Sequence, residues 1–256
     1  MDAEEKKNLQ KKIFTIDKIS EISSSVFFIR EALNPERLTI NITYYNEWDV
    51  LVKHLSFFSK LKFDNLFINI LDDGSAVSLV DKVFEIKSFG IKNISVYRIV
   101  EDIPWNIPGV RNLATFVTFT PWLIFLDIDQ HLDENSISKL LKLSSVANNG
   151  EFFTFKRTNG RFTAGTMMIS MLDLLSIHGH DESLVGNYGY NDQLLRGHLF
   201  KSNSIEYRLT DVACSEYKTP LVGNRDTSIN EEKYYTTLSM PLKPIASLNF
   251  KWMKLL

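Results

Sequence analysis

The sequence is poor in cysteine and has no excess of either charge. Its single cysteine, Cys214, can form neither an internal disulfide bond nor a site built from several cysteines, which fits a reducing compartment. The 29 Lys and Arg nearly balance the 31 Asp and Glu, and the formal net charge is -2. Proteins that bind nucleic acid need a strongly basic face, so we expect no nucleic-acid partner.

Long apolar runs are also missing. No uninterrupted apolar segment approaches the ~18 residues that a membrane span requires. The first seven residues, Met-Asp-Ala-Glu-Glu-Lys-Lys, lack the apolar core of a signal peptide. We therefore expect a cytoplasmic protein whose only contact with a membrane would be peripheral, at its inner face.

The C-terminal segment is where such a contact would form. After Glu232 the chain has no acidic residue, but it carries four lysines among aromatic side chains: Lys233, Lys243, Lys251 and Lys254 with Tyr234, Tyr235, Phe250 and Trp252. A basic aromatic tail can lie on an anionic membrane surface. The same residues can also pack on their own domain, and the sequence leaves both interpretations open.

An apolar stretch that ends in two acids stands at the centre of the chain. Trp122 to Leu126 is unbroken and follows Pro121, which is typical of a central strand buried on both faces. Asp127 and Asp129 follow at once. The carboxyl ends of such strands border the ligand site of an open α/β sheet, where paired carboxylates can hold a divalent cation against phosphate oxygens. An ordinary strand end that caps the next helix would have the same spacing.

The pattern of elements divides the chain into three parts. Residues 1–36 carry apolar residues at helical spacing, such as Leu9 and Ile13, and predict a helical appendage. Residues 37–200 alternate strands and helices, which predicts an α/β domain with a mostly parallel sheet flanked by helices. The alternation stops in the second half, so we expect a mixed or antiparallel edge there. Residues 201–256 carry weaker patterns and are interpreted as a C-terminal extension.

Further polar residues stand where strands end or helices begin. Asp73 and Ser75 follow the strand at 66–71, and Ser75 could cap a helix that starts near Val77. Arg111 falls in the first turn of a helix, where its charge opposes the helix dipole, so it either serves a site or is simply solvated. Asp192 follows a glycine-rich stretch and is interpreted as a helix cap or a base.

Six motifs in order resemble the family 2 glycosyltransferases, which have the Rossmann-like GT-A fold. They are Ile-Thr-Tyr-Tyr-Asn-Glu at 42–47, Asp-Asp-Gly-Ser at 72–75, Gly-Val-Arg-Asn-Leu-Ala at 109–114, Leu-Asp-Ile-Asp at 126–129, the segments 165–169 and 180–184, and Tyr-Asn-Asp at 190–192. The resemblance covers roughly residues 38–200. The stretch Tyr-Gly-Tyr-Asn-Asp is also similar to the catalytic segment of the β-1,4-galactosyltransferases.

This resemblance implies a metal-dependent, inverting transfer of a sugar from a nucleotide diphosphate sugar, UDP-linked, to a hydroxyl of a glycan or glycolipid. It makes Asp192 the catalytic base, and it makes Asp129 with Asp127 the ligands of Mn²⁺ or Mg²⁺. The residues implied in binding the nucleotide sugar are Thr43, Tyr45, Glu47, Asp73, Arg111 and Asp127. Residues 37–132 would form the nucleotide-sugar half and 133–200 the acceptor half, with the extension contacting acceptor or membrane. A homo-oligomer is compatible with the sequence.

The chain departs from the family pattern in places. Asn191 stands where the family carries Glu, and His178 and His180 flank Gly179 where smaller or apolar residues are commoner, which predicts an unusual acceptor pocket. No Gln-x-x-Arg-Trp segment occurs, which argues against the processive polysaccharide synthases.

Other interpretations stay open at this point. His131 and His198 could supply a third metal ligand or could be structural. A nucleotidyltransferase would need a Gly-rich basic loop after the first strand, which the segment 44–47 is not. A non-catalytic sugar-binding or scaffold subunit is compatible with Asn191.

Overall fold

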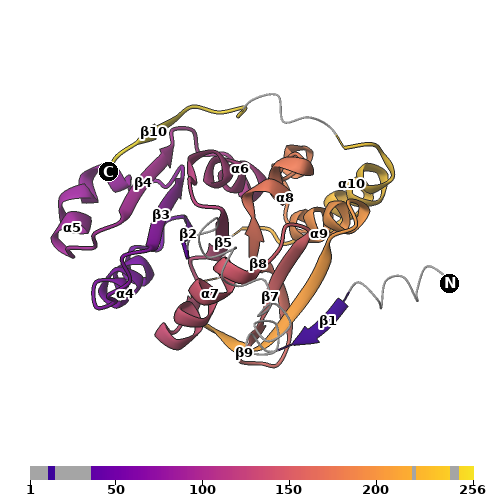
Figure 1. Ribbon diagram of the computed structural model, residues 1–256. Helices are drawn as coiled ribbons and strands as arrows, with labels where there is room; N and C mark the ends of the chain where they lie inside the picture. The colour runs from indigo at the N-terminus through magenta and orange to yellow at the C-terminus, as the bar shows by residue number, and fades with distance from the viewer. Residues whose placement is uncertain (1–10, 15–35, 221–222, 243–247) are drawn as a thin grey trace.

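The computed structural model describes residues 11–14, 36–220, 223–242 and 248–256, which build a sheet with helices on both faces (Figure 1). The strands are β1 (Lys11–Phe14), β2 (Leu38–Tyr44), β3 (Leu66–Asp73), β4 (Ile94–Ile99), β5 (Trp122–Asp127), β6 (Gln130–Leu132), β7 (Glu151–Arg157), β8 (Phe162–Ser170), β9 (Ile205–Glu216) and β10 (Trp252–Lys254). The helices are α4 (Trp48–Phe58), α5 (Val83–Ser88), α6 (Ile107–Val117), α7 (Glu134–Val146), α8 (Met171–Ser176), α9 (Asn191–Lys201) and α10 (Ser228–Ser239), with single turns η2 (Leu79–Lys82) and η3 (Glu182–Leu184).

The strands lie in the order β1-β9-β7-β8-β5-β2-β3-β4-β10, and β6 pairs with β9. The four central strands β5, β2, β3 and β4 are parallel, whereas β8 runs antiparallel to β5 and β7 antiparallel to β8. This confirms the predicted mostly parallel sheet with a mixed edge. The register sets Thr43 beside both Leu71 and Asp127, so the carboxyl ends of β2, β3 and β5 meet at one edge.

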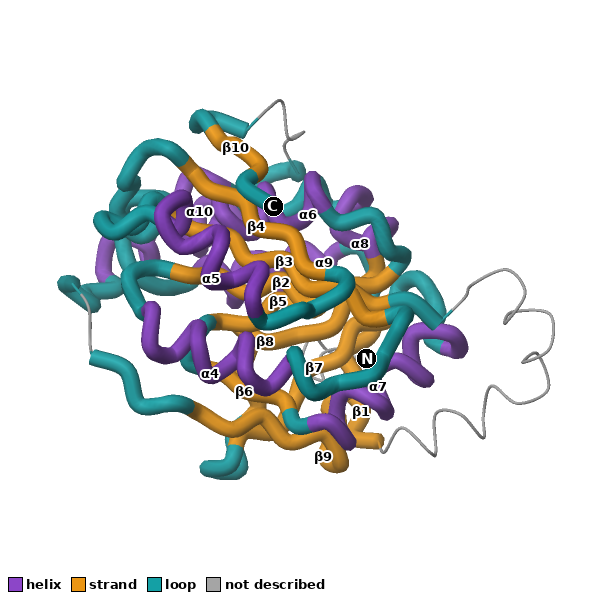
Figure 2. Tube along the Cα trace, turned by 90° about the vertical axis from the view of Figure 1, so that its left-hand side faces the viewer, coloured by secondary structure: helices purple, strands orange, loops and turns teal. Residues whose placement is uncertain are grey.

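Alternate residues of the buried strands serve two hydrophobic cores. In β5, Ile124 and Leu126 face the core that contains Leu51 of α4 and Leu140 of α7. Their neighbours in β5 face the opposite core, which is formed with α6, α8 and α9. Side chains of a strand point alternately to opposite faces, so an unbroken apolar run is what a strand covered on both faces requires. Figure 2 shows the helices on both sides of the strands.

The C-terminal segment joins the sheet. β9 pairs in parallel with β7, and β10 pairs antiparallel with the edge strand β4. Trp252 contacts the rings of Tyr97 and Phe116, with centroid separations of 6.2 and 5.7 Å, and Phe250 packs against the same core. The aromatic residues Phe250 and Trp252, for which a membrane contact was one interpretation, therefore pack on their own domain.

The helix expected at the N-terminal end of the chain can be compared with the structure. Lys11–Phe14 forms a strand that pairs in parallel with β9, so the predicted helix is wrong there; the rest of 1–35 lies outside the described residues.

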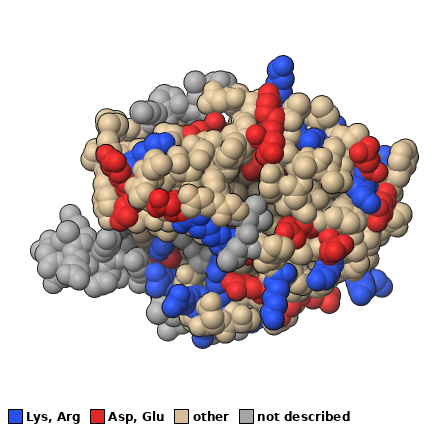
Figure 3. Space-filling view, turned by 180° about the vertical axis from the view of Figure 1, so that it is seen from behind, with Lys and Arg blue, Asp and Glu red and all other residues tan. Residues whose placement is uncertain are grey.

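In the described part of the chain, no helix combines the length and the apolar character that crossing a bilayer demands. Lys and Arg are intermixed with Asp and Glu on the face shown in Figure 3.

Candidate active site

Arg111 lies at the centre of the polar site. It projects from the early part of α6, and its side chain is 2% exposed. Nη2 donates to Oδ1 of Asp127 at 2.8 Å and to the carbonyl of Gly165 at 2.9 Å, and Nη1 donates to Oδ1 of Asp192. The guanidinium also lies 5.6 Å from the ring centre of Phe125. One buried cation thus joins the end of β5, strand β8 and the start of α9.

Asp127 and Asp192 converge although they are far apart in sequence. The nearest atoms to a Cβ added at Gly165 would be Oδ2 of each carboxylate, both at 3.1 Å, so only glycine leaves both oxygens undisturbed. The two side chains are 34% and 24% exposed, and the site opens to solvent through them. Burial opposes the charge on Arg111, but Asp192 and Asp127 outweigh that effect and raise its pKa.

Asp127 and Asp129, the metal ligands that the sequence resemblance implies, stand at the end of β5 and just after it. The backbone carbonyl of Asp129 accepts from the amide of Tyr217 at 2.7 Å, and its Oδ1 accepts from Gln130 at 3.3 Å. Burial raises the pKa of Asp127, which Arg111 opposes. No three His, Cys, Asp or Glu side chains of the described ranges form a ready-made metal site. Carboxylates at i and i+2 still fit Mg²⁺ or Mn²⁺, because such ions usually keep waters and substrate phosphates as further ligands.

Neither candidate histidine reaches these acids. The ring of His131 packs edge-on against Phe57, with centroids 4.6 Å apart, and lies beside Tyr217. His198 is buried on α9. The pKa of His180 is lowered first by burial, then by the charge of Arg111, and to a smaller extent by His198. Among the described residues, neither histidine forms a group of three potential metal ligands with these acids, which favours the structural interpretation of both.

Asp73 ends β3 close to the loop that follows β4. Its carboxylate is 5% exposed and accepts a hydrogen bond from Nδ2 of Asn106 at 2.9 Å. Burial is the main cause that raises the pKa of Asp73 to about 7. The hydrogen bond from Asn106 lowers this pKa, whereas the charges of Asp72 and Asp102 raise it further. Gly74 adopts φ +72°, and a Cβ there would lie 2.3 Å from the carbonyl oxygen of Glu101, so the two loops can approach only at glycine.

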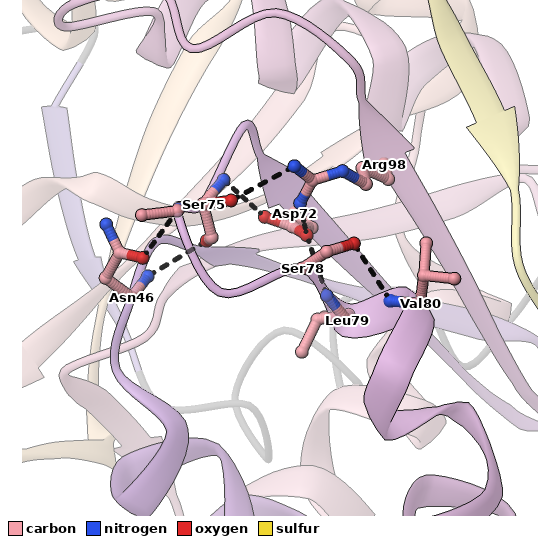
Figure 4. A network of polar contacts seen from close by, with 8 residues as sticks. Asn46, Asp72, Ser75, Ser78, Leu79, Val80 and Arg98 are labelled. Atoms are coloured by element: carbon pink, nitrogen blue, oxygen red, sulfur yellow. Dashed lines mark hydrogen bonds and ion pairs between the residues drawn. The ribbon is translucent and has the colours of Figure 1, made fainter.

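The neighbouring Asp72 has a structural role (Figure 4). Its fully buried carboxylate accepts from Arg98 Nη1 at 2.5 Å and from the amide of Ser75 at 2.9 Å. Ser75 Oγ in turn accepts from the amide of Asn46. The expectation that Ser75 caps a helix near Val77 is wrong, because Ser78 caps η2 instead. This network joins the loop after β2 to the loop after β3.

The residues of the first loop lie along the same edge. Thr43 is buried and pairs in register with Asp127. The hydroxyl of Tyr45 donates to the carboxylate of Asp102 at 3.2 and 3.3 Å, and the charge of Asp73 contributes to the raised pKa of Tyr45 after burial and Asp102. Glu47 stands half-buried at the start of α4. Tyr45 therefore contacts Asp102 and lies within electrostatic range of Asp73.

Two asparagines act in ways that sequence reasoning did not assign. Asn106 binds Asp73, as described above. Asn112 donates to the carbonyl of His180 at 2.9 Å and to Oε1 of Glu182 at 2.8 Å, and its own Oδ1 accepts from the amide of His180. The Arg-Asn pair of the 109–114 motif marked Asn112, but only the tertiary contacts show its partners. No local pattern marked Asn106.

A separate pocket lies at the opposite end of β5. It has a volume of about 500 Å³ and is lined by residues 118–122, 147–149 and 171–172. Trp122 begins β5 and Asp127 ends it, so this pocket and the acids lie at different edges of the sheet.

The model of Glycosyl transferase family 2 matches residues 39–202. The chain belongs to glycosyl transferase family 2. This confirms the resemblance drawn from the six motifs. No curated protein sequence matches the chain.

Three solved structures among those with the same fold illustrate the similarity. S. aureus TarS is 14% identical with a TM-score of 0.62, over 79% of this chain and 39% of TarS. The mannosyltransferase PcManGT from Pyrobaculum calidifontis, in complex with GDP-Man and Mn²⁺, is 13% identical with a TM-score of 0.59, over 78% of this chain and 68% of that one. GalNAc-T7 with UDP, GalNAc and Mn²⁺ is 12% identical with a TM-score of 0.63, over 79% of this chain and 47% of that one. The predicted GT-A fold is confirmed, and the chain spans well under half the length of TarS.

Proposed function

We propose that the protein transfers a sugar from a nucleotide diphosphate sugar, UDP-linked, to a hydroxyl of a glycan or glycolipid acceptor, with inversion and with Mn²⁺ or Mg²⁺ as cofactor. The observation that carries this proposal is the convergence of Asp127 and Asp192 on Arg111 beside Gly165. An inverting displacement needs a base on one side of the reacting carbon and charge stabilisation for the leaving group on the other. Asp192 would supply the base, and Asp127 with Asp129 would serve the leaving-group side.

Asp192 is the proposed base. The hydrogen bonds from Arg111 and from Nδ2 of Asn191 both end on Oδ1, whereas Oδ2 lies over Gly165. Arg111 and Asn191 therefore fix the carboxylate while its second oxygen accepts the proton of the attacking hydroxyl.

Asp127 and Asp129 would hold the divalent cation, which when bound acts as a Lewis acid on the departing diphosphate. The nucleotide would lie along the edge that carries Thr43, Tyr45, Glu47 and Asp73. Asp73 would present its carboxylate, and Asn106 its amide, to the nucleobase. Arg111 was expected to approach the nucleotide. Its guanidinium is instead buried among the acids, so we assign it to organising them.

The experiment is donor turnover by the purified chain with UDP-GlcNAc, UDP-glucose or UDP-galactose and MnCl₂, followed by UDP release with water or added saccharide as acceptor. Asp192→Asn should lower turnover about 10²- to 10⁴-fold, the usual contribution of a general base, while calorimetry finds UDP affinity within a factor of about two. Asp64→Asn, at an exposed carboxylate far along the chain, is the matched control and should keep wild-type turnover. Wild-type turnover in Asp192→Asn would remove Asp192 from the mechanism.

The cation assignment has its own measurement. Asp129→Ala should lose the part of UDP affinity that depends on Mn²⁺, because Asp129 would supply one of the carboxylates that hold the cation. Equal Mn²⁺ dependence in the variant and the wild type would refute the assignment of Asp129.

A further inference from the structure

Two aromatic side chains meet next to the proposed site without a role in it. Trp105 lies in the loop between β4 and α6, and Tyr188 lies in the loop before α9. Their ring centroids are 4.8 Å apart at 61°, and the guanidinium of Arg225 lies 5.3 Å from the centre of the Tyr188 ring. Both rings are partly exposed. Three loops thus contribute to one small aromatic surface, which we call the Trp105–Tyr188 platform.

Trp105 holds an unfavourable backbone conformation to reach this position. Its φ is +50°, a region that bulky residues rarely adopt because it is energetically costly. A buried tryptophan could repay such a cost by packing, but this ring stays partly exposed. Gly223 lies against it so closely that an added Cβ would be 2.9 Å from the indole. Strained residues of this kind cluster at active sites, ligand clamps and switch regions, which favours a ligand-binding role for the Trp105 ring.

The platform is held rigidly from behind. The amide of Gly186 donates to the carbonyl of Pro104 at 3.0 Å, which joins the two loops. Asn230, 1% exposed on α10, uses Nδ2 to reach three carbonyls of the second loop, those of Leu184, Asn187 and Gly189, at 2.8 to 3.0 Å. A surface fixed before binding loses little conformational entropy when a ligand arrives.

Each ring of the platform is close along the chain to a residue of the proposed site. Asn106, next to Trp105, binds Asp73 on the proposed nucleotide side. Asp192, the proposed base, lies at the start of α9, shortly after Tyr188 in the sequence. These short separations along the chain limit how far a ring on the platform can lie from Asp73 and Asp192.

We propose that the Trp105–Tyr188 platform binds a pyranose ring of the acceptor, which makes the acceptor a saccharide; this inference rests on the proposed function. The C–H face of a pyranose is apolar and can lie flat on an aromatic ring, while its hydroxyls remain free to bind donors such as Arg225. A lipid chain would instead need a continuous apolar surface, and the exposed guanidinium of Arg225 interrupts it.

The test follows the indole N–H signals of ¹⁵N-tryptophan-labelled full-length protein by NMR. Trp105→Phe assigns the Trp105 signal, and the signals of Trp48, Trp122 and Trp252 are internal controls. The probes are methyl β-D-galactopyranoside, methyl β-D-glucopyranoside and N-acetylglucosamine, and separately UDP with MgCl₂. At least one pyranoside should shift the Trp105 signal saturably, and Tyr188→Ala should weaken that binding about tenfold, the loss of one aromatic contact.

The outcomes separate the inference from the function on which it rests. If UDP binds by calorimetry but no pyranoside moves the Trp105 signal, the platform is not a saccharide site and the inference alone fails. If UDP moves the signal and pyranosides do not compete, the platform stacks on the nucleobase and the inference is equally wrong. Arg225→Gln, at an exposed side chain, gives a second variant should Tyr188→Ala not fold. Pyranoside binding without UDP binding would keep the platform and overturn the proposed function.

Discussion

Replacing Arg111 with methionine tests the centre of the site most directly. Methionine replaces the aliphatic part of the arginine side chain but carries no guanidinium, so the change leaves Asp127 and Asp192 facing each other over Gly165 without their shared counter-ion. Removing one partner of a buried ion pair costs about 3–5 kcal/mol. The side chains of Asp127 and Asp192 are 34% and 24% exposed and so retain part of their hydration. The expected loss in the free energy of unfolding is therefore about 3 kcal/mol, the lower end of that range.

The assay is urea unfolding at pH 7, where a lower midpoint with an unchanged slope reports lost stability. The Arg111→Met, Asp192→Asn double variant should recover at least about 1 kcal/mol relative to the sum of the single changes, because residues in one network are not additive. Lys92→Met, at the exposed pair with Asp64, is the control and should change little. An Arg111→Met protein as stable as this control, or an additive cycle, would refute the view that Arg111 organises the acids.

Two further predictions concern buried polar groups. Asp73 has its pKa raised to about 7 by burial, so the folded state keeps a proton that the unfolded chain loses above about pH 4, and stability falls as pH rises from 4 to 7. Asp73→Asn should therefore be about 2–4 kcal/mol more stable than the wild type at pH 8 but equal to it below pH 4, and parallel pH profiles of the melting temperature would contradict this. Asn230→Ala should cost about 1–3 kcal/mol and expose residues 184–189 to proteases, since one amide serves three carbonyls there; protection equal to that of Asn224→Ala, at an exposed asparagine, would count against the role of Asn230.

The sheet was predictable where periodicity and strand ends carry the information. The apolar run of β5 and the acids that follow it indicated a buried parallel strand with Asp127 at its carboxyl end, and parallel pairing then brings the end of β2 alongside. β9 was not predictable, because its buried and exposed residues do not alternate regularly. Lys11–Phe14 is too short to show a period, and its pairing with β9 depends on contacts far along the chain.

The partners of the site residues depend on tertiary packing, which no local pattern encodes. Arg111 stands where its charge opposes the helix dipole, and this position correctly marked it as unusual. From the sequence we expected the nucleotide as its partner, but its guanidinium donates to Asp127 and Asp192. Asp72 and Asp73 show the same limit. They are adjacent in sequence, yet one is enclosed by a structural network and the other faces the site loop, because neighbouring residues of a strand point to opposite sides.

The replacement of the family's Glu by Asn191 follows from the same charge balance. Arg111 already has two carboxylates around it, and a glutamate at 191 would add a third negative charge beside Asp192. The asparagine amide instead donates to Oδ1 of Asp192 at 3.2 Å, which a carboxylate at that position could not do while ionised. Asn191 therefore supports the orientation of Asp192 rather than weakening it, so the loss of the family's Glu is no argument against a catalytic site.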